Sequence, residues 1–154
     1  MPSIIKVSEN AVNINTLLNK YKREVKKLRP QDLNIKVFDK DEVLDLISNI
    51  FDVTERKKLA QVCPVHLIRN IVPHNDKEFC IHECFSSQVY LLILESKIKD
   101  RENYQYDEPD GNYMMCGGED IELIPNQLYK FNAAKQHAVM VDKLVTGYTF
   151  WFRK

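Results

Sequence analysis

The sequence predicts an α+β protein in which N-terminal helices flank an antiparallel β-sandwich or barrel. Before about residue 60, hydrophobic residues recur at helical spacing, and after it short β-rich segments alternate with turn residues. No helical pattern of useful length separates the later segments, which argues against a βαβ architecture. The 154 residues suit one domain, 1–154, with helical support in 1–60 and a β core in 61–154.

Two amphipathic patterns lie in the N-terminal part. One apolar stripe runs through residues 14–28, after a candidate N-cap at Asn13 and before Pro30. A second stripe covers residues 43–51, and a short helical turn is expected around 55–59. The opposite face of helix 14–28 is basic. It is a candidate surface for a protein partner, although we prefer the interpretation that it only solvates the helix.

The β half is expected to contain six strands separated by turns. These strands are Val65–Val72, Gln88–Glu95, Ile121–Ile124, Gln127–Phe131, Ala138–Val141 and Tyr148–Phe152. The turns are expected at Pro73, Asp110-Gly111, Gly117-Gly118 and Pro125-Asn126. Residues 97–113 are mostly polar and are predicted to form a loop.

Composition and charge narrow the function classes. Lys plus Arg and Asp plus Glu both number 22, so the formal net charge is zero, which argues against binding to nucleic acid. No apolar run approaches the roughly 20 residues of a membrane helix, and the N-terminus lacks the pattern of a signal peptide. We therefore expect a cytoplasmic protein that does not enter the membrane, with its four cysteines reduced.

Three residues of the β half carry potential metal chemistry. His74 and Asp76 are two residues apart, a spacing that places side chains on the same side of a strand. His137, at a predicted loop-to-strand junction, is the best candidate for a third ligand. Two imidazoles and one carboxylate on one face of a metal leave open positions, an arrangement that suits Fe(II). The simpler alternative is that Asp76 caps a turn after Pro73 and that His137 is an exposed residue without a ligand.

The order of these motifs resembles a known superfamily. The motifs are His74-Asn75-Asp76, the strand at 89–94, the segment 118–132 with its Pro-Asn turn, and His137-Ala138-Val139. Over roughly residues 62–152 the chain resembles the 2-oxoglutarate/Fe(II)-dependent dioxygenases, most closely their prolyl hydroxylase-like and aspartyl/asparaginyl hydroxylase-like branches. The resemblance implies a double-stranded β-helix (a jelly roll, or cupin-like barrel) and Fe(II) held by His74, Asp76 and His137. It also implies 2-oxoglutarate as cosubstrate and hydroxylation of a peptide or amino-acid side chain.

At one position the chain departs from this superfamily. Its members usually place an Arg or Lys about ten residues after the distal His, to pair with the far carboxylate of 2-oxoglutarate, but Gly147 stands there. Burying a carboxylate without a cation is costly in free energy, so Arg69 or Lys143 would have to supply the cation that is absent at position 147. The hydroxyls of Tyr90 and Thr149 are further candidates for binding the cosubstrate. The missing cation motivates a second hypothesis, a catalytically inactive cupin- or dioxygenase-like protein that acts as a binding or inhibitor protein.

A different metal site is conceivable at the cysteines. In a strand, Cys80, His82 and Cys84 would share one face, and Cys116 could complete a tetrahedral zinc site. Three such ligands would be spread over about 13 Å at the rise of a strand, which is too far for one ion. We therefore prefer to interpret the cysteines as small hydrophobic residues.

Overall fold

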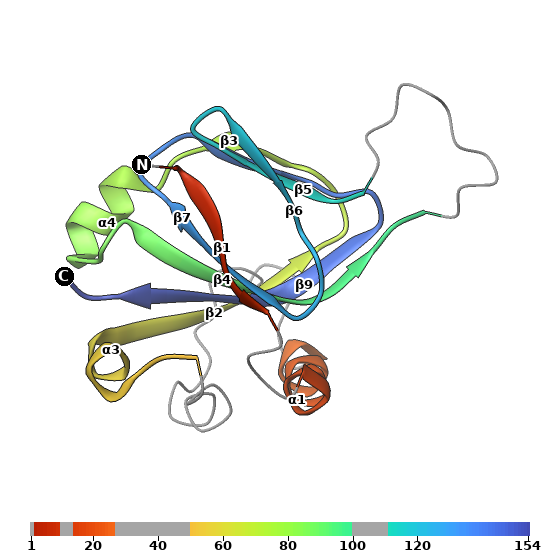
Figure 1. The fold of residues 1–154 in the computed structure, drawn as a ribbon, viewed down its shortest axis with the longest axis horizontal. Helices are drawn as coiled ribbons and strands as arrows, with labels where there is room; N and C mark the ends of the chain where they lie inside the picture. The colour runs from red at the N-terminus through yellow and green to blue at the C-terminus, as the bar shows by residue number, and fades with distance from the viewer. Residues whose placement is uncertain (1, 10–13, 27–49, 100–110) are drawn as a thin grey trace.

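The protein, seen in a computed structural model that describes residues 2–9, 14–26, 50–99 and 111–154, is built around two antiparallel sheets (Figure 1). The larger sheet has five strands in the order β1 (Ile4–Glu9), β7 (Gln127–Asn132), β4 (Gln88–Lys97), β9 (Leu144–Phe152) and β2 (Leu59–Leu67). The smaller sheet has four strands in the order β3 (Ile71–His74), β8 (His137–Met140), β5 (Tyr113–Cys116) and β6 (Glu119–Glu122).

Strand β4 shows why the larger sheet is buried on both faces. Val89, Leu91 and Ile93 belong to the core that includes Met114 and Cys116 of the smaller sheet. The alternate residues Leu92 and Leu94 belong to a second core on the opposite face of the sheet. A continuous apolar run such as residues 89–94, rather than apolar residues at every second position, is the expected result of two buried faces. One hydrophobic core therefore lies between the sheets and another beneath the larger one.

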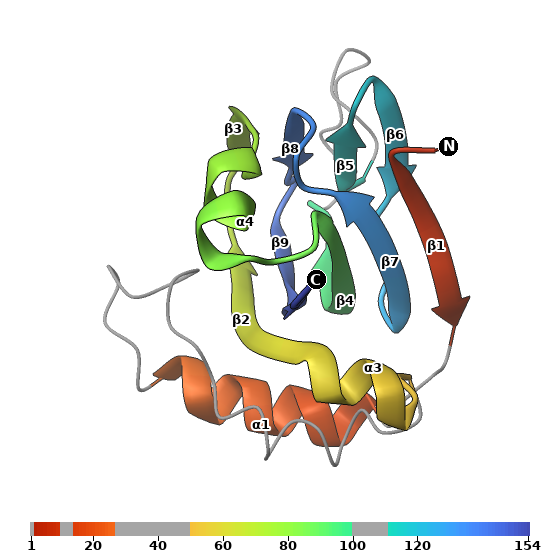
Figure 2. The same cartoon turned by 90° about the vertical axis from the view of Figure 1, so that its left-hand side faces the viewer.

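Helix α1 (Ile14–Lys26) covers the second core (Figure 2). Its Leu17 and Tyr21 are fully buried, and the Tyr21 hydroxyl donates a hydrogen bond to the carbonyl oxygen of Val65. Among its basic residues, Lys22 lies 3.5 Å from the Glu95 carboxylate of β4. A role of this basic face in binding a protein partner stays a prediction.

Two short helices complete the described fold. Helix α3 (Val53–Lys58) is capped by Asp52, whose carboxylate accepts the backbone N–H of Glu55, and it leads directly into β2. Helix α4 (Lys77–Glu83) follows β3, and its C-cap residue Cys84 adopts a left-handed conformation. In Figure 2, α4 lies at one end of the two-sheet sandwich, beside β3.

The structure agrees with the predicted order of helices and strands in part. The prediction of mostly antiparallel strands after residue 60 is confirmed, but the expected strand Val65–Val72 is wrong because residues 68–70 separate β2 from β3. Strands β1 and β5 and helix α4 were not predicted. Of the second helical stripe only residues 50 and 51 are described, where Phe51 packs in the second core; positions 43–49 lie outside the described residues.

At one glycine, a strand of the larger sheet lies too close to its neighbour for a side chain. Gly147 of β9 pairs with Ile93 of β4 on one side and with Val65 of β2 on the other. A Cβ atom built at Gly147 would lie 2.0 Å from the backbone oxygen of Leu92. The centre of the larger sheet therefore requires a residue without a side chain at this position, where the superfamily pattern has its cation.

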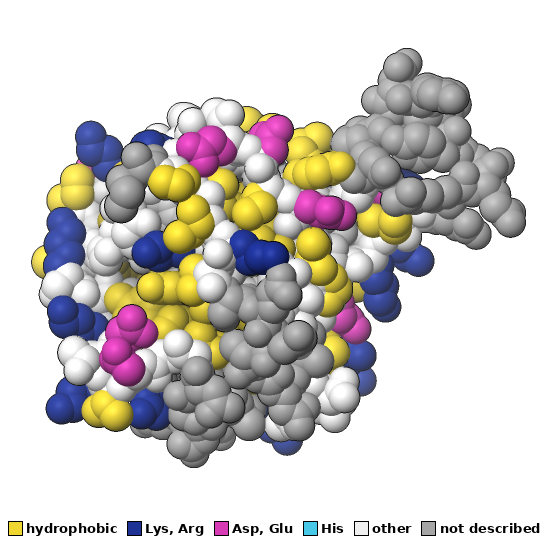
Figure 3. All heavy atoms as spheres, viewed as in Figure 1, with side chains coloured by type: hydrophobic (Ala, Val, Ile, Leu, Met, Phe, Trp, Pro, Cys, Tyr) yellow, Lys and Arg dark blue, Asp and Glu magenta, His cyan; other side chains and the backbone are white. Residues whose placement is uncertain are grey.

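The surface carries mixed charge. On the face seen in Figure 3, Lys and Arg side chains alternate with Asp and Glu side chains and with hydrophobic groups, without a large field of one sign. None of the helices within the described ranges is both long and apolar enough to cross a membrane.

Candidate metal centre

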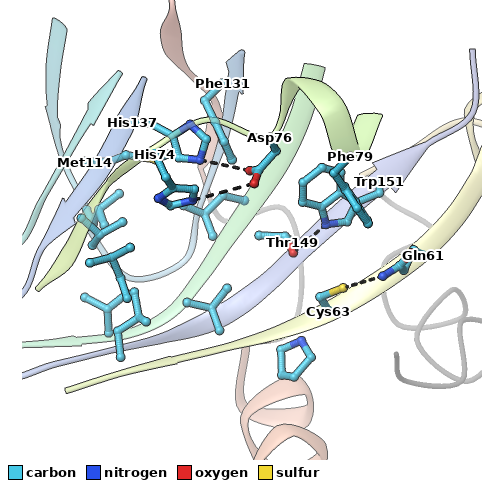
Figure 4. Close-up of a pocket in the computed structure, with 18 residues that line it drawn as sticks. Gln61, Cys63, His74, Asp76, Phe79, Met114, Phe131, His137, Thr149 and Trp151 are labelled. Carbon is cyan, nitrogen blue, oxygen red and sulfur yellow. Dashed lines mark hydrogen bonds and ion pairs between the residues drawn. The ribbon is translucent and has the colours of Figure 1, made fainter. Parts of the chain in front are cut away.

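The pairing of β3 with β8 brings the two candidate histidines together. In this antiparallel ladder His74 and His137 are direct partners, although they are 63 positions apart in the sequence. Side chains of directly opposed residues point to the same face of a sheet. The two imidazole rings accordingly meet edge to face, with 4.3 Å between their centroids (Figure 4).

Asp76 reaches the same point by a different route from the one predicted. Strand β3 ends at His74, and Asp76 is the N-cap residue of α4 rather than the next strand residue on that face. Its backbone N–H donates to the carbonyl oxygen of Ala133 at 2.7 Å, which ties the start of α4 to the turn before β8. The carboxylate makes no capping hydrogen bond. The alternative in which Asp76 serves as a side-chain cap is therefore wrong, and the carboxylate is available to a ligand.

The three side chains converge on one point. The Nε2 atom of His137 lies 3.2 Å from Asp76 Oδ2, and the Nε2 atom of His74 lies 3.9 Å from Asp76 Oδ1. One ligand atom from each residue lies within 4.8 Å of the others. Within the described part of the chain, this is the one group of three or more His, Cys, Asp or Glu side chains with such spacing.

Hydrogen bonds to the backbone orient both imidazoles toward the Asp76 carboxylate. His74 Nδ1 lies 2.9 Å from the carbonyl oxygen of Val72, and His137 Nδ1 lies 2.8 Å from that of Lys135. A carbonyl oxygen can only accept, so each Nδ1 carries the hydrogen, and a neutral ring then presents the lone pair of Nε2. Both Nε2 atoms face the Asp76 carboxylate, so that when the rings are neutral three electron-rich groups point at each other. A metal cation between them would satisfy all three, and such carbonyl partners commonly hold metal-binding histidines.

The centre lies at the boundary between solvent and a cavity. The side chain of His137 is 5% exposed, that of Asp76 is 28% exposed and that of His74 is 44% exposed. Solvent can thus reach the site from the His74 side. The structure contradicts the alternative in which His137 is merely an exposed residue.

Below the three residues, a cavity of about 510 Å³ opens between the sheets (Figure 4). Its volume falls within the range of about 300–1,000 Å³ that is usual for small-molecule sites. Most of its wall is hydrocarbon, contributed by both sheets and by α4. The apolar lining residues are Pro64, Val65, Leu67, Ile71, Phe79, Leu91, Met114, Leu123, Phe131, Val139, Val145 and Trp151.

A short polar chain runs along one side of the cavity. The indole N–H of Trp151 donates to Thr149 Oγ1 at 3.0 Å, and the Gln61 amide N–H donates to the Cys63 sulfur at 3.2 Å. Burial raises the pKa of the Cys63 thiol, against the opposite effect of its hydrogen bonds with Gln61 and Thr149. The thiol is therefore kept neutral, and these polar groups largely satisfy one another.

The four residues predicted to bind a cosubstrate lie in different places. Thr149 lines the cavity. Tyr90 points to the opposite face of β4, where it packs against Phe152 and lies beneath the Lys130 ammonium. Arg69 and Lys143 are exposed, in the segments between β2 and β3 and between β8 and β9, and neither lines the cavity.

The alternative zinc site is not assembled. Cys80 and His82 lie on α4 and Cys84 directly follows it, so the strand geometry assumed for them is wrong. Cys80 is buried while His82 and Cys84 are exposed, because positions two apart on a helix point in different directions. Cys116 is buried on β5, in the smaller sheet.

Several residues of the cavity were missed in the sequence. Met114 belongs to the unpredicted strand β5, and Phe79 belongs to the unpredicted helix α4. The Gly117-Gly118 turn that joins β5 to β6 was a signal for a hairpin and could have located Met114. The Asn75-Asp76 pair followed by Glu78 is a typical start of a helix and could have located Phe79.

Comparison with known proteins adds no identity to this geometry. No protein-family model matches the sequence, and no curated protein matches it significantly. The case for a function therefore rests on the arrangement of the side chains.

Proposed function

We propose that the protein is an Fe(II)-dependent oxygenase whose metal is held by His74, Asp76 and His137. The observation that carries the proposal is the orientation of both imidazoles, which direct Nε2 toward the Asp76 carboxylate at the mouth of the cavity. Two imidazoles and one carboxylate are the ligand set of non-haem iron oxygenases, and they leave positions open on the metal. When bound, Fe(II) would supply the redox chemistry that activates O₂ for attack on a C–H bond.

The side chains of the protein would bind the metal, orient its ligands and shield the reacting carbon from water. His137 is nearly fully buried and holds its position through Lys135, so it fixes the inner side of the centre. The apolar cavity beneath it would exclude water from the reacting carbon, and the more exposed His74 leaves an approach from solvent. A peptide or amino-acid side chain, the substrate class implied by the sequence resemblance, stays part of the proposal.

We also propose that the two sheets form the double-stranded β-helix of the dioxygenase superfamily. From β2 onward the strands alternate between the sheets except at the β5–β6 hairpin, with β2, β4, β7 and β9 in the larger sheet and β3, β5, β6 and β8 in the smaller one. This alternation and the order β2-β9-β4-β7 opposite β3-β8-β5-β6 support a jelly roll. Strand β1 adds to the free edge of β7, and α1 covers the outer face of the larger sheet.

2-Oxoglutarate, the cosubstrate implied by the resemblance, does not fit the described lining of the cavity. No Lys or Arg of the described residues lines it, and the second carboxylate of 2-oxoglutarate requires a cation or several free donors. The proposal therefore names Fe(II) and includes no step that depends on 2-oxoglutarate.

Anaerobic loading with Fe(II) tests the proposal. Elemental analysis should find one iron per chain in the native protein and none in the His74→Ala variant after the same desalting step. Nitric oxide, which binds ferrous sites with an open position, should then produce a paramagnetic adduct detectable by electron paramagnetic resonance. A protein that retains no iron, or iron that does not react with nitric oxide, would support the alternative of an inactive binding or inhibitor protein.

A further inference from the structure

The chemistry of the cavity indicates which compounds could share the metal. Apart from the three metal-binding candidates, its polar side chains are Gln61 and Thr149, together with the Cys63 thiol and the Trp151 indole N–H. The indole N–H is donated to Thr149 and a Gln61 amide N–H is donated to Cys63. These bonds engage the indole N–H and one Gln61 N–H within the wall. The other donors of the described lining are neutral groups, the second Gln61 N–H and the Thr149 hydroxyl, and none of the described lining residues is a Lys or Arg.

The charge of the centre adds a second constraint. A divalent cation and the Asp76 carboxylate sum to one positive charge, since both histidines bind as neutral rings. A ligand that chelates the metal through a single carboxylate and a neighbouring carbonyl neutralises this charge. A second carboxylate on the same ligand would enter the mostly apolar cavity without a cationic partner among its described lining residues, at a large cost in desolvation.

We propose that the cavity binds a monoanionic 2-oxo acid with a hydrocarbon tail, which chelates the metal through its keto-acid end and buries its tail. This inference rests on the proposed function and names the class of ligand for the same site. The apolar side chains of Leu91, Met114, Phe131 and Val139, from both sheets, supply the walls for the tail. At about 510 Å³ the cavity has room for a branched chain of several carbons.

Two ligands of matched shape test the inference. In 5-methyl-2-oxohexanoate an isopropyl group stands where 2-oxoglutarate has its second carboxylate. Both are titrated by calorimetry into the protein loaded with Mn(II), a redox-inert substitute that prefers imidazole and carboxylate to thiolate. Trp151, the single tryptophan of the chain, lines the cavity and gives an independent fluorescence signal for tail binding.

The expected result is that 5-methyl-2-oxohexanoate binds at least about tenfold more tightly than 2-oxoglutarate, because its tail gains from burial and loses no charge hydration. Removal of Mn(II), or the His74→Ala substitution, should abolish this binding. Equal or tighter binding of 2-oxoglutarate, failure of both acids to bind, or binding that persists without metal would each overturn the inference while the proposed metal centre stands. Failure of the protein to bind Mn(II) or Fe(II) at all is a separate result, and it overturns the proposed function first.

Discussion

Loading with Fe(II) is expected to raise the melting temperature of the protein, because the three ligands come together only in the folded chain. His74 ends β3, Asp76 precedes α4 and His137 begins β8, so an ion that contacts all three binds the native state and not the unfolded one. At a metal concentration one hundred times the dissociation constant, this linkage adds about 2.7 kcal/mol to the free energy of unfolding. For a chain of 154 residues the gain corresponds to an increase of about 8 °C in melting temperature.

Two substitutions turn this increase into a test of the ligand set. Asp76→Asn keeps the size of the side chain but removes its charge, and it should lower the metal-free stability little because the Asp76 side chain makes no capping bond. The increase with Fe(II) should fall to a small fraction of the native value. His82→Asn is the matched control, since the His82 side chain is 85% exposed on α4 and belongs to no cluster of potential ligands.

The assay is thermal unfolding followed by circular dichroism under argon, with and without Fe(II). The native protein and His82→Asn should show the full increase, and Asp76→Asn should not. An equal increase in all three proteins would mean that the metal binds elsewhere. If the native protein shows no increase at saturating Fe(II), the convergence of the three side chains does not serve metal binding.

Three further predictions concern the sheet, the cavity and the thiols. Gly147→Ala should lower the free energy of unfolding by about 3 kcal/mol or more in urea titrations, because its Cβ would overlap the backbone of Leu92. Gly118→Ala is the comparison: Gly118 has open space around it but a φ of +85°, so the substitution should lower the free energy of unfolding by only about 1–2 kcal/mol. Met114→Lys should reverse the ligand preference and favour 2-oxoglutarate in calorimetry, because it places a cation in the cavity wall; a folded variant that keeps the native preference would contradict the charge argument. At pH 8 one thiol, the exposed Cys84, should react rapidly with Ellman's reagent, and simultaneous reaction of all four would contradict the described burial. Burial raises the pKa of the other three thiols and keeps them protonated at this pH; they are Cys63, Cys80 and Cys116.

The sequence located the three metal-binding candidates, although not for the right structural reason. A spacing of two residues between His74 and Asp76 was interpreted as one face of a strand, but the strand stops at His74 and the chain turns into α4. Convergence depends on the hydrogen bond from Asp76 to Ala133, a tertiary contact across 57 positions that no local pattern contains. The pairing of His74 with His137 is equally long-range. His137 was selected from its place at a predicted loop-to-strand junction and from the superfamily resemblance, and neither of them predicted that the two histidines are opposed in one ladder.

Candidate cosubstrate residues were harder to predict, because the face of the sheet to which a side chain points depends on the register of its strand. Tyr90 and Thr149 both lie on strands of the larger sheet, yet Thr149 points into the cavity and Tyr90 points away from it. Where a strand carries a continuous apolar run, as β4 does over residues 89–94, alternation cannot tell which face lies toward which core. The β5 strand escaped prediction because its four residues follow a long polar segment, and Met114 was therefore absent from the expected site.

The position of His74 at the margin of the smaller sheet has a consequence for the dynamics of that sheet under the proposed metal binding. Strand β3 has a single neighbour, β8, and its ladder is irregular between Ile71 and His74, so few backbone hydrogen bonds hold it in place. An ion bridging His74 and His137 would link β3 to β8 and stabilise this edge strand. Amide hydrogens of β3 should then exchange slowly with solvent when metal is present and quickly when it is removed. The exchange rate of this edge strand would therefore report whether metal occupies the site.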